Sequence, residues 1–183
     1  MSGDVVDLIM DDHREVERLF GELREHPDKR PLLTPVLSAL LVAHSRAEEA
    51  EVYPVAKDEA GEREDVAHAQ HEHAKAEHTL KQLVEADPQS PQYDQLLREL
   101  EEAITHHIEE EESTMLSQMR ERLSDDRRAE LGQVFADSRA RHLGDRPEQA
   151  TKEEVQLQAR NAGLQGASSM DKEELLQQLQ STP

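Results

Sequence analysis

Length, composition and charge exclude several classes of protein. The chain has 183 residues, of which 35% are hydrophobic and 34% charged, with two tyrosines, two phenylalanines, no tryptophan and no cysteine. So few aromatic side chains disfavour a β-sheet core and a base-stacking surface. The absence of cysteine excludes disulfides and thiolate metal sites. The net charge of −20 disfavours nucleic acids and anionic membranes as partners.

Targeting signals are not evident in the chain. No apolar run approaches the ~20 residues of a membrane-spanning helix, and the first residues lack the basic and apolar regions of a secretory signal. We therefore expect a soluble, cytoplasmic protein with no membrane partner. Ten histidines are many for this length, and without cysteine a transition-metal site must use imidazole and carboxylate ligands.

Turn-forming residues divide the chain into long segments that lack strand-like alternation. The predicted helices span residues 4–25, 32–58, 62–86 and 91–122, followed by a shorter helix over 126–142. We expect Pro54 to bend the second helix and an aspartate to cap the fifth. Short connections between long helices predict an all-α fold, an antiparallel up-down four-helix bundle.

Each of the four long helices carries an apolar stripe at a spacing of about 3.6 residues, and a histidine interrupts each stripe near its middle. The polar residues in phase with the stripes are His13, His44, Glu48, His73, His107 and Glu111. The chain contains other His-x-x-x-Glu pairs, and such pairs are common on solvated helix faces. Only His44/Glu48 and His107/Glu111 have both members in phase.

These six side chains are also predicted to lie at one depth in the bundle. Each histidine is 14 to 16 residues from the nearest turn at one end, roughly 22 Å along a helix. Two buried carboxylates at one level would repel each other and cost several kcal/mol unless paired. A cation of charge +2 or more removes that cost and holds the imidazoles neutral. The alternative is a metal-free hydrogen-bond network.

Four histidines and two glutamates are too many ligands for one tetrahedral ion. They suit two ions, each held by two histidines and bridged by both carboxylates, with positions left open for an exogenous ligand. Nitrogen and oxygen ligands suit iron, with manganese or zinc as alternatives. The set differs from the Glu-x-x-His pattern of ferritin-like sites.

Two segments carry a resemblance to a known family. Residues 44–54 and 107–112 resemble the repeated His-x-x-x-Glu-Glu signature of hemerythrin-like (HHE cation-binding) domains, and residues 11–13 and 71–73 resemble the first and third ligand segments. The resemblance covers residues 1–143. It implies a diiron centre, two iron ions with an oxo or hydroxo bridge, held by His13, His44, Glu48, His73, His107 and Glu111.

The chain departs from the oxygen carriers of that family. Those proteins use an additional histidine and an aspartate, whereas this chain has Glu77 in place of the histidine and Glu112 at the aspartate position, and phase favours Glu111. Fewer histidines imply a more open and more reactive site. The resemblance to bacterial members of the family implies that this protein senses or processes O₂, NO or peroxide.

Several polar residues leave alternatives open. His68, His71 and His78 are interpreted as a solvated face, the alternative being a route for iron or a proton donor near the centre. His106 is an alternative ligand to its neighbour His107. Tyr53 is interpreted as core filling with a polar tip, the alternative being a hydrogen-bond donor beside the centre.

The C-terminal part is predicted to be a separate unit, with residues 144–150 as linker and 151–183 as a small helix-turn-helix. Residues 151–154 form a capping box. The unit resembles SAP-like, Rho N-terminal-type modules, some of which bind nucleic acid. Residues 145–183 hold four basic and seven acidic residues, a net charge of −3, so we expect a protein partner instead.

Three functions fit the sequence. The first is a diiron protein that binds or turns over O₂, NO or H₂O₂ as a sensor or scavenger. The second is iron uptake, storage or delivery, since an acidic surface attracts cations. The third is a metal-free helical scaffold whose C-terminal unit recruits a partner.

Overall fold

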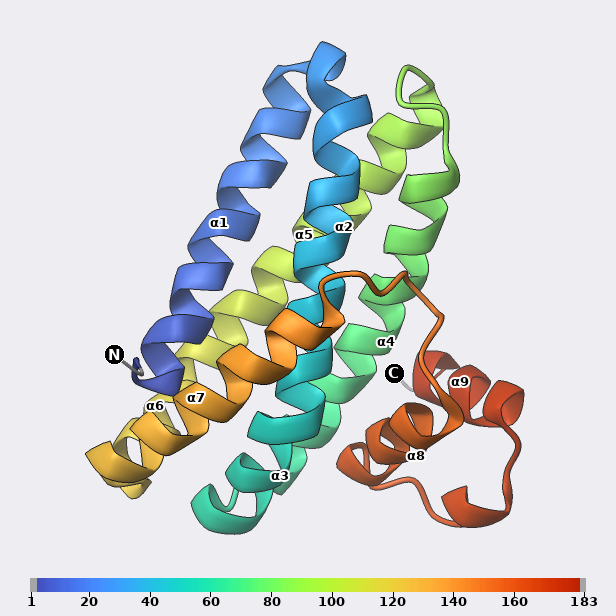
Figure 1. Cartoon of the computed structure of the whole chain (residues 1–183). Helices are drawn as coiled ribbons and strands as arrows, with labels where there is room; N and C mark the ends of the chain where they lie inside the picture. Colours follow the sequence, from blue (N-terminus) through green and yellow to red (C-terminus); the bar gives the residue numbers. More distant parts are fainter. Residues whose placement is uncertain (1–2, 182–183) are drawn as a thin grey trace.

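The computed structural model describes residues 3–181, and within that range every regular element is helical. The four long helices run alternately up and down as an antiparallel bundle, as predicted (Figure 1). They are α1 (Val5–Glu25), α2 (Arg30–Ala47), α4 (Arg63–Glu85) and α5 (Pro91–Ser113). The shorter helices are α3 (Tyr53–Val55), α6 (Met115–Arg122), α7 (Asp125–His142), α8 (Lys152–Asn161) and α9 (Lys172–Ser181). Single 3₁₀ turns occur at Pro27–Lys29 and Ala167–Ser169.

Side-chain caps determine where several helices begin. The Asp4 carboxylate accepts the Val6 N–H at the start of α1, and the Ser90 hydroxyl accepts the Tyr93 N–H at the start of α5. The cap of α7 is Ser124, so the predicted aspartate cap is wrong. The two aspartates that follow occupy the first turn instead, where the helix dipole favours negative charge.

The second predicted helix continues to residue 60 through two wider turns. π-Helical turns at Glu48–Val52 and Ala56–Ala60 flank α3. Pro54 has no N–H to donate, and its ring crowds the backbone carbonyl in the preceding turn. A wider, π-helical turn accommodates the missing hydrogen bond and gives the ring more room. The bend expected at this proline therefore takes the form of π-helical turns. Gly61 ends the helix in the left-handed conformation, with φ of 82°.

The helix predicted over 91–122 is broken, which corrects the prediction. It divides at Thr114 (φ −111°, ψ −86°) into α5 and α6. The hydroxyls of Ser113 and Thr114 donate to the backbone oxygens of Glu109 and Glu110, each at 2.7 Å. Such back-bonding competes with the helical ladder and bends helices.

The core consists of apolar clusters on either side of a polar layer. One cluster lies toward the α3 and α6 end and includes Ile9, Tyr53 and Phe135. The other lies toward the opposite end and includes Leu19 and Leu100. The polar residues predicted from the stripes lie between them, so the stripe pattern describes a real layer of the bundle.

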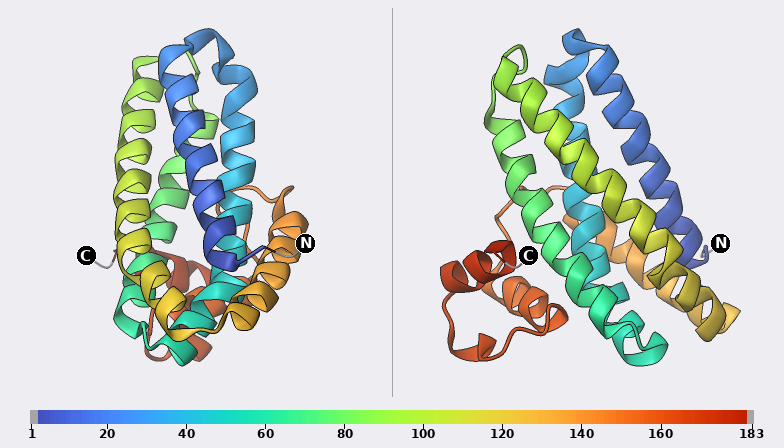
Figure 2. Two further views of the ribbon diagram at one scale, coloured as in Figure 1. Left: turned by 90° about the vertical axis from the view of Figure 1, so that its left-hand side faces the viewer. Right: turned by 180° about the vertical axis from the view of Figure 1, so that it is seen from behind.

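The remaining helices cover the outside of the bundle. Helix α7 crosses α1 and α2, and the α8–α9 pair packs on α4 (Figures 1 and 2). A third apolar cluster joins Ala74 of α4 to Val155, Ala159, Leu175 and Leu179 of the C-terminal pair. The predicted capping box is present at Thr151 and Glu154. The boundary at 144–150 stays a prediction.

No helix within residues 3–181 is both long enough and apolar enough to cross a membrane.

Candidate metal centre

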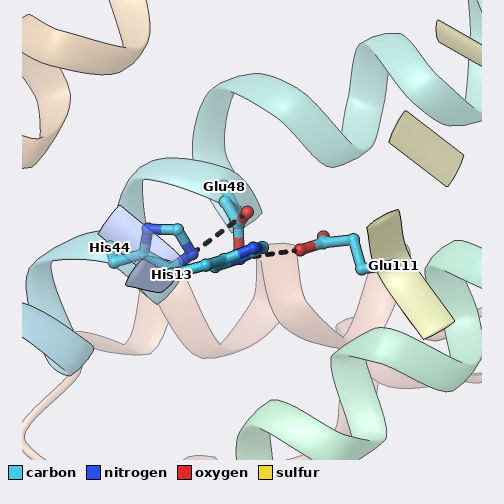
Figure 3. A group of neighbouring side chains, drawn as sticks. All are labelled: His13, His44, Glu48 and Glu111. Atoms are coloured by element: carbon cyan, nitrogen blue, oxygen red, sulfur yellow. Dashed lines mark ion pairs between the residues drawn. The ribbon is translucent and has the colours of Figure 1, made fainter. Parts of the chain in front are cut away.

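The four stripe histidines and both glutamates meet in one buried layer. All six residues are at most 5% exposed. Glu111 Oε2 lies 3.3 Å from His13 Nε2, and the Glu48 oxygens lie 3.2 Å from His44 Nε2 and 3.4 Å from His73 Nε2. Figure 3 shows His13, His44, Glu48 and Glu111 pointing toward one another. The six residues therefore lie at a common depth in the bundle, as predicted.

The layer divides into two possible ion sites that share one carboxylate. Ligand atoms of His13, His44, Glu48 and Glu111 lie within 4.8 Å of one another, and so do those of Glu48, His73 and His107. We call these the first and second ligand groups. Glu48 belongs to both, whereas Glu111 Oε2 lies 3.8 Å from His107 Nε2 and groups with the first.

A second set of carboxylates orients the histidines. The Nδ1 atom of each stripe histidine lies 2.8 to 3.2 Å from an outer carboxylate oxygen. The pairs are His13 with Glu112, His44 with Asp12, His73 with Glu49, and His107 with Glu72. A carboxylate on Nδ1 fixes the tautomer that leaves Nε2 free to bind a metal. This arrangement is the usual environment of metal-binding histidines.

The outer carboxylates form a closed ring around the bundle. Each is adjacent in sequence to one of the six residues, yet each serves the histidine of the next long helix: α1 to α2, the π-helical turn after α2 to α4, α4 to α5, and α5 to α1. The apolar stripes gave no prediction of this ring. The sequence feature that could have predicted the ring is an acidic residue directly beside one of the six candidate ligands on each helix. Successive side chains on a helix differ in direction by about 100°, so such a neighbour faces the adjacent helix instead of the core.

The inner atoms fit a cation because most of them have no hydrogen-bond partner. His13 Nε2, His44 Nε2, both Glu48 oxygens and both Glu111 oxygens are buried without a hydrogen bond among the described residues. An unsatisfied buried polar group costs about 1–3 kcal/mol. Six such atoms in one layer, all nitrogen or oxygen, would be satisfied together if cations bound there.

Charge inside the layer is strongly coupled. Burial lowers the pKa of His44, but Glu48 and Asp12 outweigh it and raise that pKa to about 10. Burial raises the pKa of Glu111, but His13, His107 and His44 outweigh it and lower the pKa to about 2. Without a cation the neighbouring carboxylates therefore favour the protonated form of His44. A metal must displace that proton to bind.

Tyr53 fills the core, as interpreted from the sequence, and its polar tip also contacts the layer. It is fully buried, and its hydroxyl lies 3.0 Å from His73 Nε2. Burial, with Glu48 and Glu111 nearby, raises its pKa well above the usual value. The residue is thus a neutral hydrogen-bonding group beside the second ligand group.

The remaining histidines differ in their surroundings. His106 is 59% exposed in its side chain and pairs with Glu110, whereas His107 points into the layer. His68 is also exposed and lies 3.4 Å from Glu72. His68, Glu72 and Glu110 line an open pocket of about 290 Å³, and His107 is also part of its wall. The route for iron named as an alternative stays a prediction.

His71 is not part of a solvated face, which corrects that interpretation. It is 8% exposed, and its Nδ1 atom lies 2.8 Å from the backbone oxygen of Leu179 on α9. His78 keeps a half-exposed side chain and pairs with Glu148 of the linker at 2.8 Å. Both contacts come from segments more than 65 residues away in sequence.

A small cavity adjoins the layer on its aliphatic side. It measures about 30 Å³, and all four stripe histidines contribute to its wall together with Leu41, Leu100 and Ile104. A cavity needs about 10–15 Å³ of this kind of volume to hold one water. The space therefore suits one small molecule beside the metal ligands.

Comparison with known proteins identifies the family. The model of the hemerythrin HHE cation-binding domain matches residues 4–119. The chain belongs to this family. The hemerythrin resemblance is thereby confirmed, and with it a helical, cation-binding domain whose buried histidine and glutamate groups are able to hold a metal. The family match ends before α8, so the resemblance of residues 151–183 to SAP-like modules stays a prediction.

A relative from Nostoc sp. named DNA nickase is 28% identical to this HHE-domain chain over 133 residues. The alignment covers 72% of this chain and 38% of the relative, so the chain spans well under half of that protein's length. No solved structure matches the chain.

Proposed function

We propose that this protein holds two iron ions in the six-residue layer and uses them to bind or process O₂, NO or H₂O₂. The observation that supports it best is the set of buried nitrogen and oxygen atoms without partners, backed by a carboxylate on each histidine. His13, His44, Glu48 and Glu111 would hold one ion, and His73, His107 and Glu48 the other.

Iron bound there would supply a redox change and an open coordination position for a small ligand. The chain's own residues orient the ligand atoms, exclude bulk water from the layer and provide a wall of aliphatic side chains beside it. The adjacent cavity of about 30 Å³ supports a diatomic molecule or peroxide as the ligand class. These features favour sensing or scavenging over storage.

We do not propose that this protein cleaves DNA strands. The name of the Nostoc relative suggests that activity, but the shared region is 38% of that protein. The net charge of −20 here opposes binding to a polyanion.

Iron content of the purified, untagged protein after iron-replete expression tests the proposal. We expect about two irons per chain, falling to about one in His107→Ala. The matched control is His106→Ala, its exposed neighbour, which should keep both. If the natural protein contains no metal, the diiron proposal is contradicted and the scaffold function is favoured. An iron content far above two atoms per chain would favour storage.

The ligand is tested on the loaded protein. We expect spectral changes on adding NO or peroxide to the ferrous protein, and loss of any steady consumption in Glu111→Ala. An exposed acid on the same helix, Glu109, gives the control Glu109→Ala. A loaded protein that responds to none of the three molecules would contradict this part of the proposal.

A further inference from the structure

The C-terminal helix α8 places two buried polar side chains against the metal layer. Gln158 and Asn161 are 3% and 2% exposed. Gln158 Nε2 donates to Glu49 Oε2 at 2.9 Å, and Asn161 Nδ2 donates to the Glu49 backbone oxygen at 2.9 Å. Buried amides of this kind are found where their hydrogen bonds are satisfied. Both residues lie outside the region that matches the family model.

Glu49 connects these side chains to a stripe histidine. Its Oε1 atom lies 2.9 Å from Gln70 Nε2 and 3.2 Å from His73 Nδ1, while Oε2 accepts from Gln158 and from Arg46 at 3.2 Å. Four donors on two oxygens hold the carboxylate in one orientation. That orientation fixes the ring of His73, because Glu49 is the partner of its Nδ1 atom.

We propose that the C-terminal helices contribute to metal binding, because Gln158 holds the Glu49 carboxylate and Glu49 in turn orients the ring of His73. Gln158 is a positioning residue, since it touches the outer carboxylate and not the inner atoms. The inference rests on the proposed function, because it concerns how tightly the second ligand group holds its ion.

The effect is specific to one of the two ligand groups. On the other side of the bundle, Arg139 of α7 pairs with Asp12, the partner of His44 in the first ligand group. Each ligand group thus has one outer carboxylate anchored by a helix beyond α5. Gln158 reaches only the group that contains His73. The two anchors predict that the two ions respond separately to substitutions in α7 and α8.

Coupling of this kind acts in both directions. If docking of α8 strengthens metal binding at the second ligand group, metal at that group strengthens docking of α8 by the same factor. Hydrogen exchange in α8 and α9 should therefore be slower in the iron-loaded protein than in the metal-free protein. Equal exchange in the two forms would contradict the coupling.

The test is the release of Fe²⁺ from the anaerobically loaded full chain into a ferrous chelator. We expect two phases of about one iron each. Gln158→Met keeps the length of the side chain and removes the donor, and should accelerate one phase about tenfold, as outer-ligand substitutions do. Arg139→Met should accelerate the other. Gln156→Met on the same helix is the matched control and should change neither.

A substitution in α9 distinguishes the effect of the Gln158 hydrogen bond from the effect of the apolar packing that holds α8 and α9 on the bundle. Leu179→Ala loosens the third apolar cluster, where this side chain is fully buried, and leaves Gln158 in place. Acceleration by Leu179→Ala but not by Gln158→Met would reassign the effect to docking and overturn the positioning role. Two normal phases in Gln158→Met would overturn it as well, with the diiron proposal intact. A natural protein that holds no iron would overturn both.

Discussion

At the scale of single residues, adjacent acidic positions have different roles. Glu48 points into the layer and is fully buried without a hydrogen bond, whereas Glu49 beside it binds the Nδ1 atom of His73. The same division separates Glu111 from Glu112, which binds His13. A helix turns side chains by about 100° per residue, so one faces the core and the next faces a neighbouring helix.

Glu48 is the residue whose loss should affect both ions. It is the one side chain common to the first and second ligand groups among the described residues. Glu48→Gln keeps the volume and removes the charge that both sites share, so we expect less than one iron per chain. Glu49→Gln retains all inner ligands and should retain more iron. Metal analysis of both variants checks this, and equal iron content in the two would contradict the shared role.

At the scale of elements, α7 is a cover for the first ligand group. Phe135 lies edge-on to the ring of His44, with centroids 5.9 Å apart, and Arg139 pairs with Asp12 behind that histidine. The helix approaches the start of α1 closely at Gly132. A Cβ at this glycine would collide with the backbone oxygen of Gly3.

Gly132→Ala should therefore move α7 away from α1. We expect a loss of about 1–3 kcal/mol in the free energy of unfolding, the usual range for overpacking, together with faster hydrogen exchange in α7. Gly21→Ala is the matched control, because a Cβ there meets nothing within 4 Å. In a helix that change is expected to stabilise by about 0.5–1 kcal/mol. Denaturant unfolding of both variants measures the difference, and equal effects would argue against the close contact.

At the scale of the whole molecule, the polar layer of candidate ligands lies between two large apolar clusters. We therefore expect the metal-free protein to keep its helical bundle. Chelation should lower the melting temperature, because a ligand that binds only the folded state stabilises it, without abolishing helical circular dichroism. Unfolding of the chain on chelation would show that the flanking clusters are insufficient. An unchanged melting temperature would favour the metal-free scaffold.

A carboxylate between α7 and α8 attaches this segment to the bundle, so we expect the packing of α8 and α9 on the bundle to be sensitive to acid. Glu148 accepts hydrogen bonds from His78 and from Gln180 at 2.8 Å each and pairs with Lys81 at 3.2 Å. Burial raises its pKa, but His78, Lys81 and Gln180 outweigh burial, so the pKa lies below its ordinary value of 4.5.

Because the folded pKa is the lower one, the stabilisation is present above about pH 4.5 and is lost as the pH falls through the folded value. Glu148→Gln should lower stability by about 1 kcal/mol at pH 7, with a difference that shrinks toward pH 3. Thermal unfolding of both proteins from pH 7 to pH 3 measures it. A difference that stays constant over this range would show that ionisation of Glu148 is not involved.

The sequence by itself determined the helices, their apolar stripes and the common depth of the six polar residues. Helical phase and rise are local properties, so counting along one segment places His44 and Glu48 on the same face. The family signature lies in the same segments. The role of the six residues as ligands stays a prediction that metal analysis tests.

The tertiary structure decided which side chains surround that layer. The outer carboxylate of each histidine comes from a neighbouring helical segment, and Tyr53 reaches His73 from a segment flanked by π-helical turns. Gln158 reaches Glu49 across 109 residues. Such contacts depend on lateral packing between helices, and helical periodicity within one segment carries no information about the neighbour that a side chain will face.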